Sequence, residues 1–203
     1  VQQFLYGSDF GISLFGNYGE AKLSDRDKKI YKLLKAEIEK IAKGEKSGTG
    51  IEIENPDKTK GTWTSATSGS LTEADKNLIQ TYSAIDTELI LDCLLVDCPY
   101  SLYWFDKTEG MSTEIQMEAT KTETTLTGRV SKWIFKFAVA EEYQDGSDQY
   151  KVKTISDLGT TLAAVKTNAE KIVSDNKAKS DYKKLSAYKK EICDRVSYDS
   201  AAA

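Results

Sequence analysis

The sequence predicts an α+β fold in which an antiparallel β meander is flanked by amphipathic helices. Three observations lead to this prediction: apolar residues recur at helical spacing after Ser24, alternate with polar residues between Tyr100 and Val152, and return to helical spacing after Leu158. We expect two parts, an α+β domain over residues 1–154 and a helical segment over residues 155–203.

The composition is that of a folded protein. The 203 residues include 39% hydrophobic ones and 3 Trp, 6 Phe and 11 Tyr, which is enough apolar material for one good core and excludes a disordered tail. Val1 stands where an initiator Met would, so we expect either a fragment or a mature chain that follows a removed segment.

Charge and hydropathy exclude two classes of partner. The net charge is −4, and the lysines are interleaved with acids rather than gathered in a stripe, so nucleic acid is not an expected partner. The longest apolar run, Ile90 to Val96, is interrupted by Asp92 and is far shorter than the roughly 18 residues that cross a bilayer. We therefore expect no membrane span.

The first predicted helix begins at Ser24. Before it, residues 1–23 mix aromatic residues with glycines and predict irregular structure. Ser24 is a capping residue, and Asp25 and Asp27 stand in the first turn, where the helix dipole favours acids. Gly44 ends the helix. Its apolar positions are Ile30, Leu33, Leu34, Ile38 and Ile41.

A strand, a loop and a second helix follow. Ile51 and Ile53 alternate with glutamates and predict a half-buried strand over residues 50–54. Residues 55–70 are rich in Gly, Ser, Thr and Lys and predict a loop or hairpin tip that carries Trp63. Residues 71–98 predict one helix, capped by Thr72, whose buried stripe comprises Leu78, Tyr82, Ile85, Leu89 and Cys93.

Residues 100–152 predict the meander. We expect β structure at Leu102 to Phe105, a turn at 106–110, and strands around Ile115 to Ala119 and Trp133 to Val139. Asp145-Gly146 is the strongest hairpin signal. An exposed strand and turn are predicted from the tract of threonines at positions 120, 122, 124, 125 and 127.

Two helices are predicted at the C-terminal end. Leu158, Leu162, Val165, Ala169 and Ile172 are spaced for one buried face. A second helix starts at its cap, Ser180, and carries Leu185, Tyr188, Ile192 and Val196.

The three cysteines give no catalytic or metal site. The chain has no histidine and no C-x-x-C pair, so no general base and no zinc ligand set can be named. Cys193 borders the apolar stripe of the last helix, which predicts a buried thiol rather than a reactive one. Cys93 and Cys98 are predicted to be two buried free thiols. The alternatives are a disulfide between them or one from Cys98 to Cys193.

The remaining candidates are aromatic and acidic. Trp104, with its aromatic neighbours, fits either core packing or a sugar-stacking surface, and Trp63 is the better exposed candidate. The acid pairs Glu141-Glu142 and Asp106 with Glu109 match no calcium-loop spacing and are interpreted as solvated surface. We assign no catalytic, cofactor-binding or metal-binding residue and expect no cofactor.

Two stretches resemble a known family. They are residues 92–108, DCLLVDCPYSLYWFDKT, and residues 169–203, AEKIVSDNKAKSDYKKLSAYKKEICDRVSYDSAAA. Together they resemble the region just upstream of the catalytic core in transglutaminase-like proteins secreted by Gram-positive bacteria. The resemblance implies a papain-like Cys-His-Asp enzyme whose catalytic residues would all lie beyond Ala203.

The functional hypotheses follow from this resemblance. The first is a non-catalytic N-terminal accessory or pro-like segment of an extracellular or cell-surface transglutaminase-like protease, cross-linker or deamidase, with the remainder of that core as partner. The second is a cell-surface module that binds glycan or protein, in which Trp63 or Trp104 would contact the ligand. A standalone thiol enzyme built on Cys193 is the third, and it lacks a nameable base.

Overall fold

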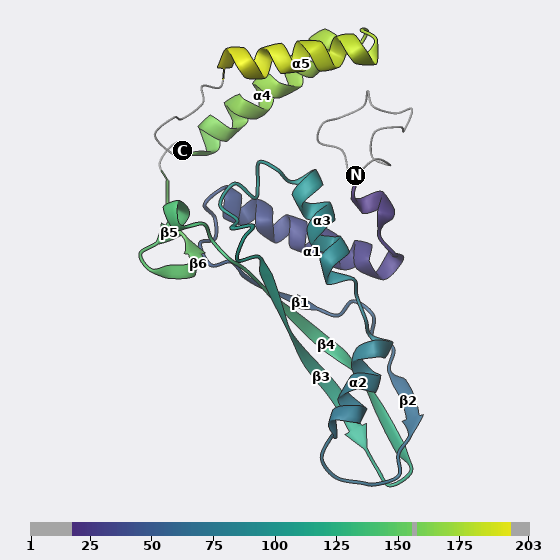
Figure 1. Ribbon diagram of the computed structural model, residues 1–203. Coiled ribbons are helices and arrows are strands. Elements are labelled where there is room, and N and C mark those ends of the chain that lie inside the picture. The colour runs from purple at the N-terminus through teal and green to yellow at the C-terminus, as the bar shows by residue number, and fades with distance from the viewer. Residues whose placement is uncertain (1–17, 156–157, 196–203) are drawn as a thin grey trace. The chain divides into compact units, whose positions relative to one another are not determined.

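The computed structural model of the protein describes residues 18–155 and 158–195. The chain divides into two compact units, one formed by residues 17–156 and another that contains helices α4 and α5. The first unit combines three α-helices with antiparallel sheets, which confirms the predicted α+β fold (Figure 1). Most of the expected irregular stretch before Ser24 lies outside the described residues.

Helix α1 (Asp25–Ala42) begins and ends where the sequence predicts. The Ser24 side chain accepts a hydrogen bond from the backbone N–H of Asp27, and Gly44 takes the left-handed conformation with φ 75° just beyond the last turn. Four of its five predicted apolar positions are buried, and Leu33 is the exception at 44% exposure. The capping pattern therefore set the helix bounds correctly.

One long strand organises the main sheet. Strand β4 (Thr125–Phe137) pairs antiparallel with β3 (Met111–Lys121) on one side, and with β1 (Gly50–Glu54) and β2 (Gly61–Thr64) on the other. Strand β1 pairs with residues 132–136 of β4 and β2 with residues 125–128, so the second edge of the sheet is built from two short strands placed end to end.

A β-bulge separates the two halves of the sheet. Gln116 pairs with Lys132 and Met117 with Val130, which leaves Ser131 as the extra residue of β4. Asn55 fills the gap between β1 and β2, because its backbone N–H donates to the Ser131 carbonyl at 2.8 Å and its side-chain amide to the Val130 carbonyl at 2.7 Å. These bonds satisfy backbone groups of β4 that neither short strand reaches.

The core lies on one face of the sheet. Helices α1 and α3 (Thr87–Asp97) cover the half that contains β1, and α2 (Glu73–Tyr82) covers the half that contains β2 (Figure 1). Ile51, Ile53, Trp133 and Phe135 face the helices and are buried, while alternate positions such as Glu52 and Lys132 are exposed or half-exposed and form an ion pair at 2.6 Å. The alternation predicted for the strands is thus confirmed.

The single helix predicted over residues 71–98 is wrong, since the structure has two. Helix α2 ends at Tyr82, where Arg26 donates to the Tyr82 carbonyl at 2.9 Å, and the Ser83 hydroxyl accepts from the backbone N–H of Val130 at 3.0 Å. Asp86 then caps α3 by accepting from the N–H of Leu89. Tertiary hydrogen bonds at residues 82–83 thus end a helix that the apolar spacing would continue.

Two further predictions between the helices and strands are wrong. Residues 102–105 form turns with one isolated bridge, from Phe105 to Val139, instead of a strand. The predicted loop at residues 55–70 contains β2, whose four residues include only one large apolar side chain, Trp63. By contrast, Gly110 and Gly146 adopt positive φ in the predicted turn at 106–110 and in the predicted hairpin.

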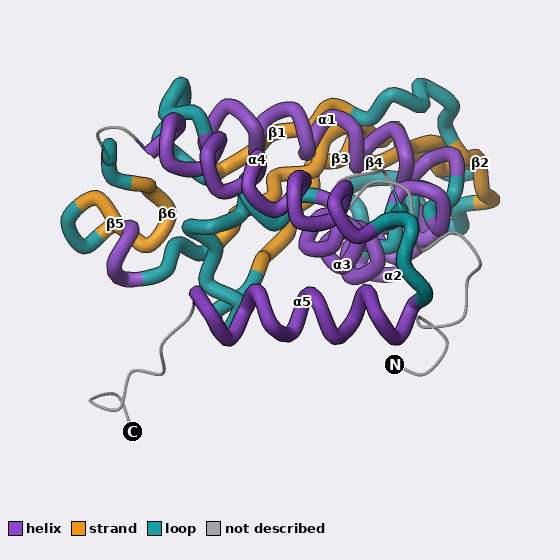
Figure 2. Tube along the Cα trace, turned by 90° about the horizontal axis from the view of Figure 1, so that it is seen from above, coloured by secondary structure: helices purple, strands orange, loops and turns teal. Residues whose placement is uncertain are grey.

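A small hairpin completes the first unit. Strands β5 (Gln144–Asp145) and β6 (Asp148–Val152) follow the short helix η3 (Glu141–Tyr143) and form a separate two-stranded sheet. In Figures 1 and 2 this hairpin stands at the end of the unit opposite β2. Its Val152 is buried and belongs to the main core.

Helices α4 (Leu158–Asn176) and α5 (Asp181–Arg195) form the described part of the second unit. Both predicted helices are present, but their predicted apolar faces are only partly covered. Val165, Leu185 and Ile192 are exposed at 46%, 59% and 62%, whereas Leu162, Ala169, Ile172 and Tyr188 are half-buried. Helix α5 buries none of its described residues. Val196, the last member of the predicted stripe, lies outside the described residues.

Candidate functional site

The cysteines occupy two kinds of environment. Cys93 and Cys98 are buried free thiols, and the Cys93 thiol donates to the Gly19 carbonyl at 3.1 Å. Burial raises the pKa of Cys98 to about 11, which keeps this thiol protonated at neutral pH. Cys193 is also free, but it is exposed on α5, so the prediction of a buried Cys193 is wrong.

The two buried thiols are unsuited to act as nucleophiles. The sequence has no histidine to act as a base, and a protonated buried thiol is a poor nucleophile. Among the described residues, no group of three or more His, Cys, Asp or Glu side chains could hold a metal ion. Two of the three thiols are thus parts of the core.

Trp104 and its neighbours are core residues as well. Trp104 is fully buried, with its ring 6.3 Å from that of Phe137 in an edge-to-face arrangement, and Leu102 and Phe105 are buried beside it. A ligand cannot reach this indole face, so the sugar-stacking alternative at Trp104 is wrong. The Cys-Pro-Tyr-x-Leu-Tyr-Trp-Phe segment closes the core against β4.

One of the two acid pairs is solvated, and in the other pair Asp106 holds a turn. Glu141 and Glu142 are exposed on η3, which confirms that this pair is solvated. The Asp106 carboxylate accepts from the backbone N–H groups of Thr108 and Glu109 at 2.7 and 3.2 Å and thereby holds the turn before β3.

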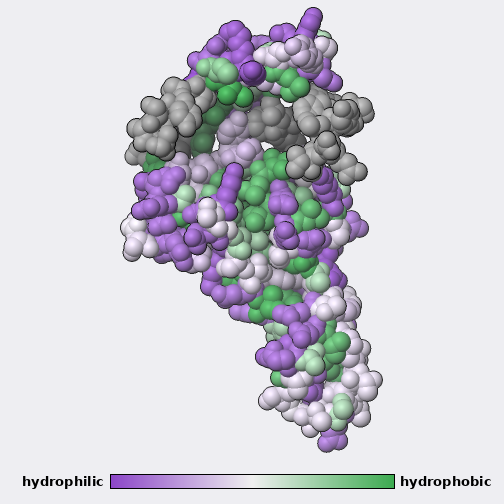
Figure 3. Space-filling view, in the orientation of Figure 1, coloured by the Kyte–Doolittle hydropathy of each residue, from purple (hydrophilic) through white to green (hydrophobic). Residues whose placement is uncertain are grey.

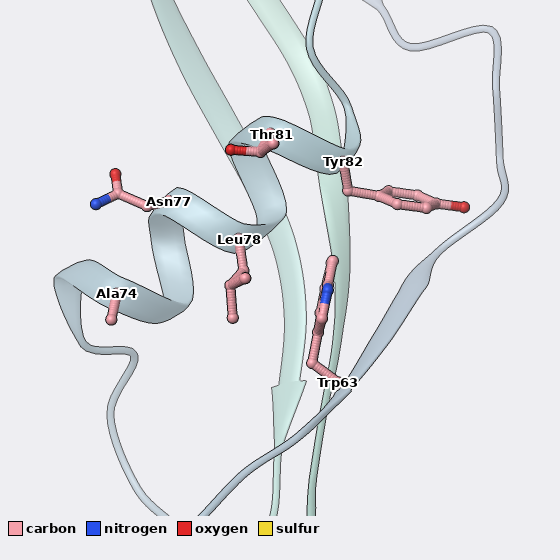
Figure 4. Close-up of a pocket in the computed structure, with 6 residues that line it drawn as sticks. All are labelled: Trp63, Ala74, Asn77, Leu78, Thr81 and Tyr82. Atoms are coloured by element: carbon pink, nitrogen blue, oxygen red, sulfur yellow. The ribbon is translucent and has the colours of Figure 1, made fainter.

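Trp63 lies at an open hollow between α2 and β2. The hollow has a volume of about 570 Å³ and is lined by Trp63, Ala74, Asn77, Leu78, Thr81 and Tyr82. We call these six residues the α2–β2 hollow. In Figure 4, Leu78 points from α2 toward the indole, and Tyr82 lies at one end of the ring. Of the two tryptophans that the sequence offers as ligand contacts, Trp63 thus lies at a concave surface, whereas Trp104 is buried.

Two neighbours fix the position of the Trp63 ring. The Tyr82 ring meets it edge to face, with centroids 5.6 Å apart. Gly61 leaves room for it, because a Cβ atom at this position would lie 2.3 Å from Cη2 of Trp63. The indole is consequently packed against the backbone of its own strand, while part of its surface is open to solvent.

Helix α2 is held against the sheet by an ion pair and by a buried side chain. A capping box links Thr72 and Asp75, and the Lys121 ammonium donates to the Asp75 carboxylate at 2.6 Å. Ile79 of α2 is fully buried against Gly128 of β4. A Cβ atom on Gly128 would lie only 2.9 Å from Cδ1 of Ile79, so α2 and β4 are in close contact. One wall of the hollow is therefore anchored to the sheet.

The hollow is electrically neutral and has a polar rim. None of its six residues is charged. In the part of the chain that the structure describes, the Asn77 amide, the Thr81 hydroxyl and the Tyr82 hydroxyl make no hydrogen bond with another residue. In Figure 4 the Asn77 and Thr81 side chains project from α2 on the side away from Trp63, and the Tyr82 hydroxyl projects on the opposite side. Asn77 and Thr81 are exposed and can therefore bond to a ligand or to water.

Only part of this site is predictable from the sequence. Trp63 was singled out for its polar surroundings, but Leu78 and Tyr82 were predicted to be buried, whereas Leu78 is exposed at 42%. Ala74, Asn77 and Thr81 carried no signal of their own. Their spacing of three and four residues would place them on one helix face, but only the position of β2 shows that this face borders Trp63.

Apolar surface is not confined to the hollow. Figure 3 shows hydrophobic side chains gathered over α1 and α3, where Leu33 and Val96 are exposed at 44% and 48%. The α2–β2 hollow differs from that surface by its concave shape and its polar rim, rather than by its hydrophobicity.

A second exposed surface lies on α5. Tyr182, Leu185 and Ile192 are exposed at 80%, 59% and 62%, and their spacing of three and seven residues places them along one side of the helix. We call these three residues the α5 stripe. Ion pairs such as Lys184–Asp181 and Arg195–Glu191 stabilise the helix locally.

Comparison of the chain with protein-family models, curated proteins and solved structures found no match. Of the described helices, none is long and apolar enough to span a membrane.

Proposed function

We propose that this chain is a non-catalytic accessory segment of an extracellular transglutaminase-like cysteine enzyme, and that the α5 stripe packs against the catalytic core of that enzyme. The observation that carries the proposal is the exposure of the α5 stripe on a helix of 15 residues that buries none of them. An amphipathic helix with an uncovered apolar side is typical of a contact surface for another folded element.

The chemistry of the thiols supports a non-catalytic role. Cys93 and Cys98 are buried, the pKa of each thiol is raised chiefly by burial, and the chain supplies no imidazole. Cys193 is accessible to small reagents, but a thiol without a base or an orienting carboxylate is not activated for catalysis at neutral pH. Any catalytic Cys-His-Asp set would have to come from another part of a larger protein.

The resemblance supplies the identity of the partner. In the transglutaminase-like proteins that this chain resembles, a helix with the pattern DYKKLSAYKKEICDRVSYD leads directly into the catalytic core. Helix α5 contains the first fifteen residues of that pattern. A helix that directly precedes the catalytic core needs apolar side chains along one side in order to pack on that core, and the α5 stripe provides them.

Two measurements test this function. Sequencing the source gene beyond the codon for Ala203 should reveal a Gly-x-Cys segment followed by His and Asp. An unrelated domain there would contradict the family assignment. The isolated chain should neither cleave nor cross-link a casein substrate, and Cys193→Ala should behave identically. Turnover by the isolated chain that disappears in Cys193→Ala would refute the non-catalytic role.

A further inference from the structure

The α2–β2 hollow calls for its own explanation, because the proposed role of α5 does not use it. It lies in the unit of residues 17–156, whereas α5 belongs to the other unit. A ligand in the hollow would add a function beyond the accessory role, and neither function depends on the other.

We propose that the α2–β2 hollow binds a neutral saccharide, with one sugar ring lying on the exposed surface of Trp63 and its hydroxyl groups bonded at the rim. The C–H face of a pyranose ring is apolar, whereas its edge carries hydroxyl groups. A site for it therefore needs an accessible aromatic surface with neutral donors and acceptors around it. Trp63 provides the first, and Asn77, Thr81 and Tyr82 provide the second.

The electrostatics select an uncharged ligand. All six lining residues are neutral, and the nearest charged side chains of α2 are already paired: Asp75 with Lys121 at 2.6 Å, and Lys76 with Glu73 at 2.6 Å. A phosphate, a nucleotide or a strongly acidic glycan would lack a counter-charge in the hollow. A neutral sugar needs none.

The site is preformed, which reduces the entropy cost of binding. The Trp63 indole is held between the backbone at Gly61 and the edge of Tyr82, and α2 is anchored by the Lys121–Asp75 pair and by buried Ile79. Side chains that are already ordered lose little rotamer freedom when a ligand binds.

A proline-rich peptide is the competing ligand, because such peptides also dock on Trp and Tyr side chains. The rim favours the sugar. The Asn77 amide and the Thr81 and Tyr82 hydroxyls combine donors and acceptors, which suits a ligand with many hydroxyl groups better than a polyproline helix, whose prolines offer only carbonyl acceptors. Titration with both kinds of ligand separates the two.

Tryptophan fluorescence gives a selective first assay. Of the three tryptophans, Trp104 and Trp133 are exposed at 0% and 3%, so only Trp63 can report a ligand at the surface. Titration of the full chain with chitotetraose, cellotetraose and xylotetraose should change the emission with at least one of them. Polygalacturonate and a decaproline peptide should leave it unchanged.

Calorimetry on variants locates the site. Trp63→Ala should abolish binding of the responsive sugar, and Asn77→Ala and Thr81→Ala should each weaken it about five-fold, the equivalent of one lost hydrogen bond. Both polar residues are exposed, so these two variants remain informative even if Trp63→Ala unfolds. Leu33→Ala, at an exposed apolar residue of α1 outside the hollow, is the control and should bind like the wild type.

Three results would overturn the proposal: no response to any of the three neutral sugars, a response to the charged polymer or decaproline alone, or sugar affinity that Asn77→Ala and Thr81→Ala both leave unchanged. None of these results would affect the accessory role of α5, which concerns another unit and a protein partner.

Discussion

The Tyr31 hydroxyl donates a hydrogen bond to the Asp97 carboxylate at 2.7 Å, and both side chains are buried between α1 and α3. The same carboxylate accepts from the backbone N–H groups of Gly19 and Glu20 at 3.0 and 3.2 Å. Burial and this hydrogen bond raise the pKa of Tyr31 well above its usual range. Asp97 thus joins three segments of the first unit.

Removing this carboxylate should destabilise the protein strongly. Asp97→Ala leaves the buried Tyr31 hydroxyl and the Gly19 N–H without their acceptor, and we expect the free energy of unfolding to fall by about 3 kcal/mol. Urea denaturation followed by circular dichroism measures this. Asp92→Ala, an exposed aspartate of the same helix, is the control and should change stability by less than about 0.5 kcal/mol. Equal effects of the two substitutions would refute the role assigned to Asp97.

The Asp75–Lys121 pair should make stability depend on acid pH. Hydrogen bonds from Lys121 and from Thr72 lower the pKa of Asp75 from 3.8 to about 2. A carboxyl group whose pKa is lower in the folded state contributes stability that is full above pH 4 and is lost as the pH falls toward 2.

NMR titration of the Asp75 side-chain carboxyl measures this effect. In Lys121→Met the pKa of Asp75 should rise toward its ordinary value but stay below it, because the Thr72 bonds remain. In Lys76→Met, whose ammonium pairs with Glu73, it should stay where it is in the wild type. A pKa of Asp75 near 3.8 in the wild type would contradict the ion pair.

The cysteines should differ sharply in reactivity. Cys193 is exposed, whereas Cys93 and Cys98 are buried, so native protein should react with a thiol reagent at one site and unfolded protein at three. Mass spectrometry after brief iodoacetamide treatment identifies the sites. Cys193→Ala should abolish the rapid reaction. Rapid labelling of Cys98 in native protein would show that the core around it is open.

Gly61 should tolerate no side chain. A Cβ atom there would lie 2.3 and 2.6 Å from two atoms of the Trp63 ring, so Gly61→Ala must displace the indole, and we expect a loss of about 1–3 kcal/mol together with a shift in tryptophan emission. Gly50→Ala, in the neighbouring edge strand, meets nothing within 4 Å and should change stability by less than about 0.5 kcal/mol. Wild-type emission in Gly61→Ala would contradict the placement of Trp63.

Structural features that depend on residues close together in the sequence were predicted correctly. Ser24 and Thr72 were predicted as caps because the capping bond joins residues three apart, and the structure confirms both. The break between α2 and α3 was missed because it depends on Arg26 and Val130, which are distant in the sequence. Asp86, a good capping residue before Leu89, was the local signal that could have revealed the second helix.

Burial was harder to predict than secondary structure. Trp104 lies in a run of residues with high strand propensity, but the backbone there forms turns. Its side chain is buried in the core against Phe137, and this packing outweighs the strand propensity. Ile192 belongs to a predicted buried stripe and Cys193 borders it, yet both are exposed in the described chain. Periodicity shows which residues share a side of a helix, but not whether another element covers that side.

Hydrogen exchange of α5 tests the central claim most directly. It compares the amides of residues 181–195 in the isolated chain with those in a protein where the chain is followed by a transglutaminase-like core. We expect fast exchange in the isolated chain and strong protection in the longer protein.

A pair of substitutions in the α5 stripe, Leu185→Glu with Ile192→Glu, should abolish that protection. Lys183→Gln with Lys190→Gln, which changes the net charge by the same amount on the other side of α5, should preserve it. Equal exchange of α5 in the isolated chain and in the longer protein would contradict the proposal.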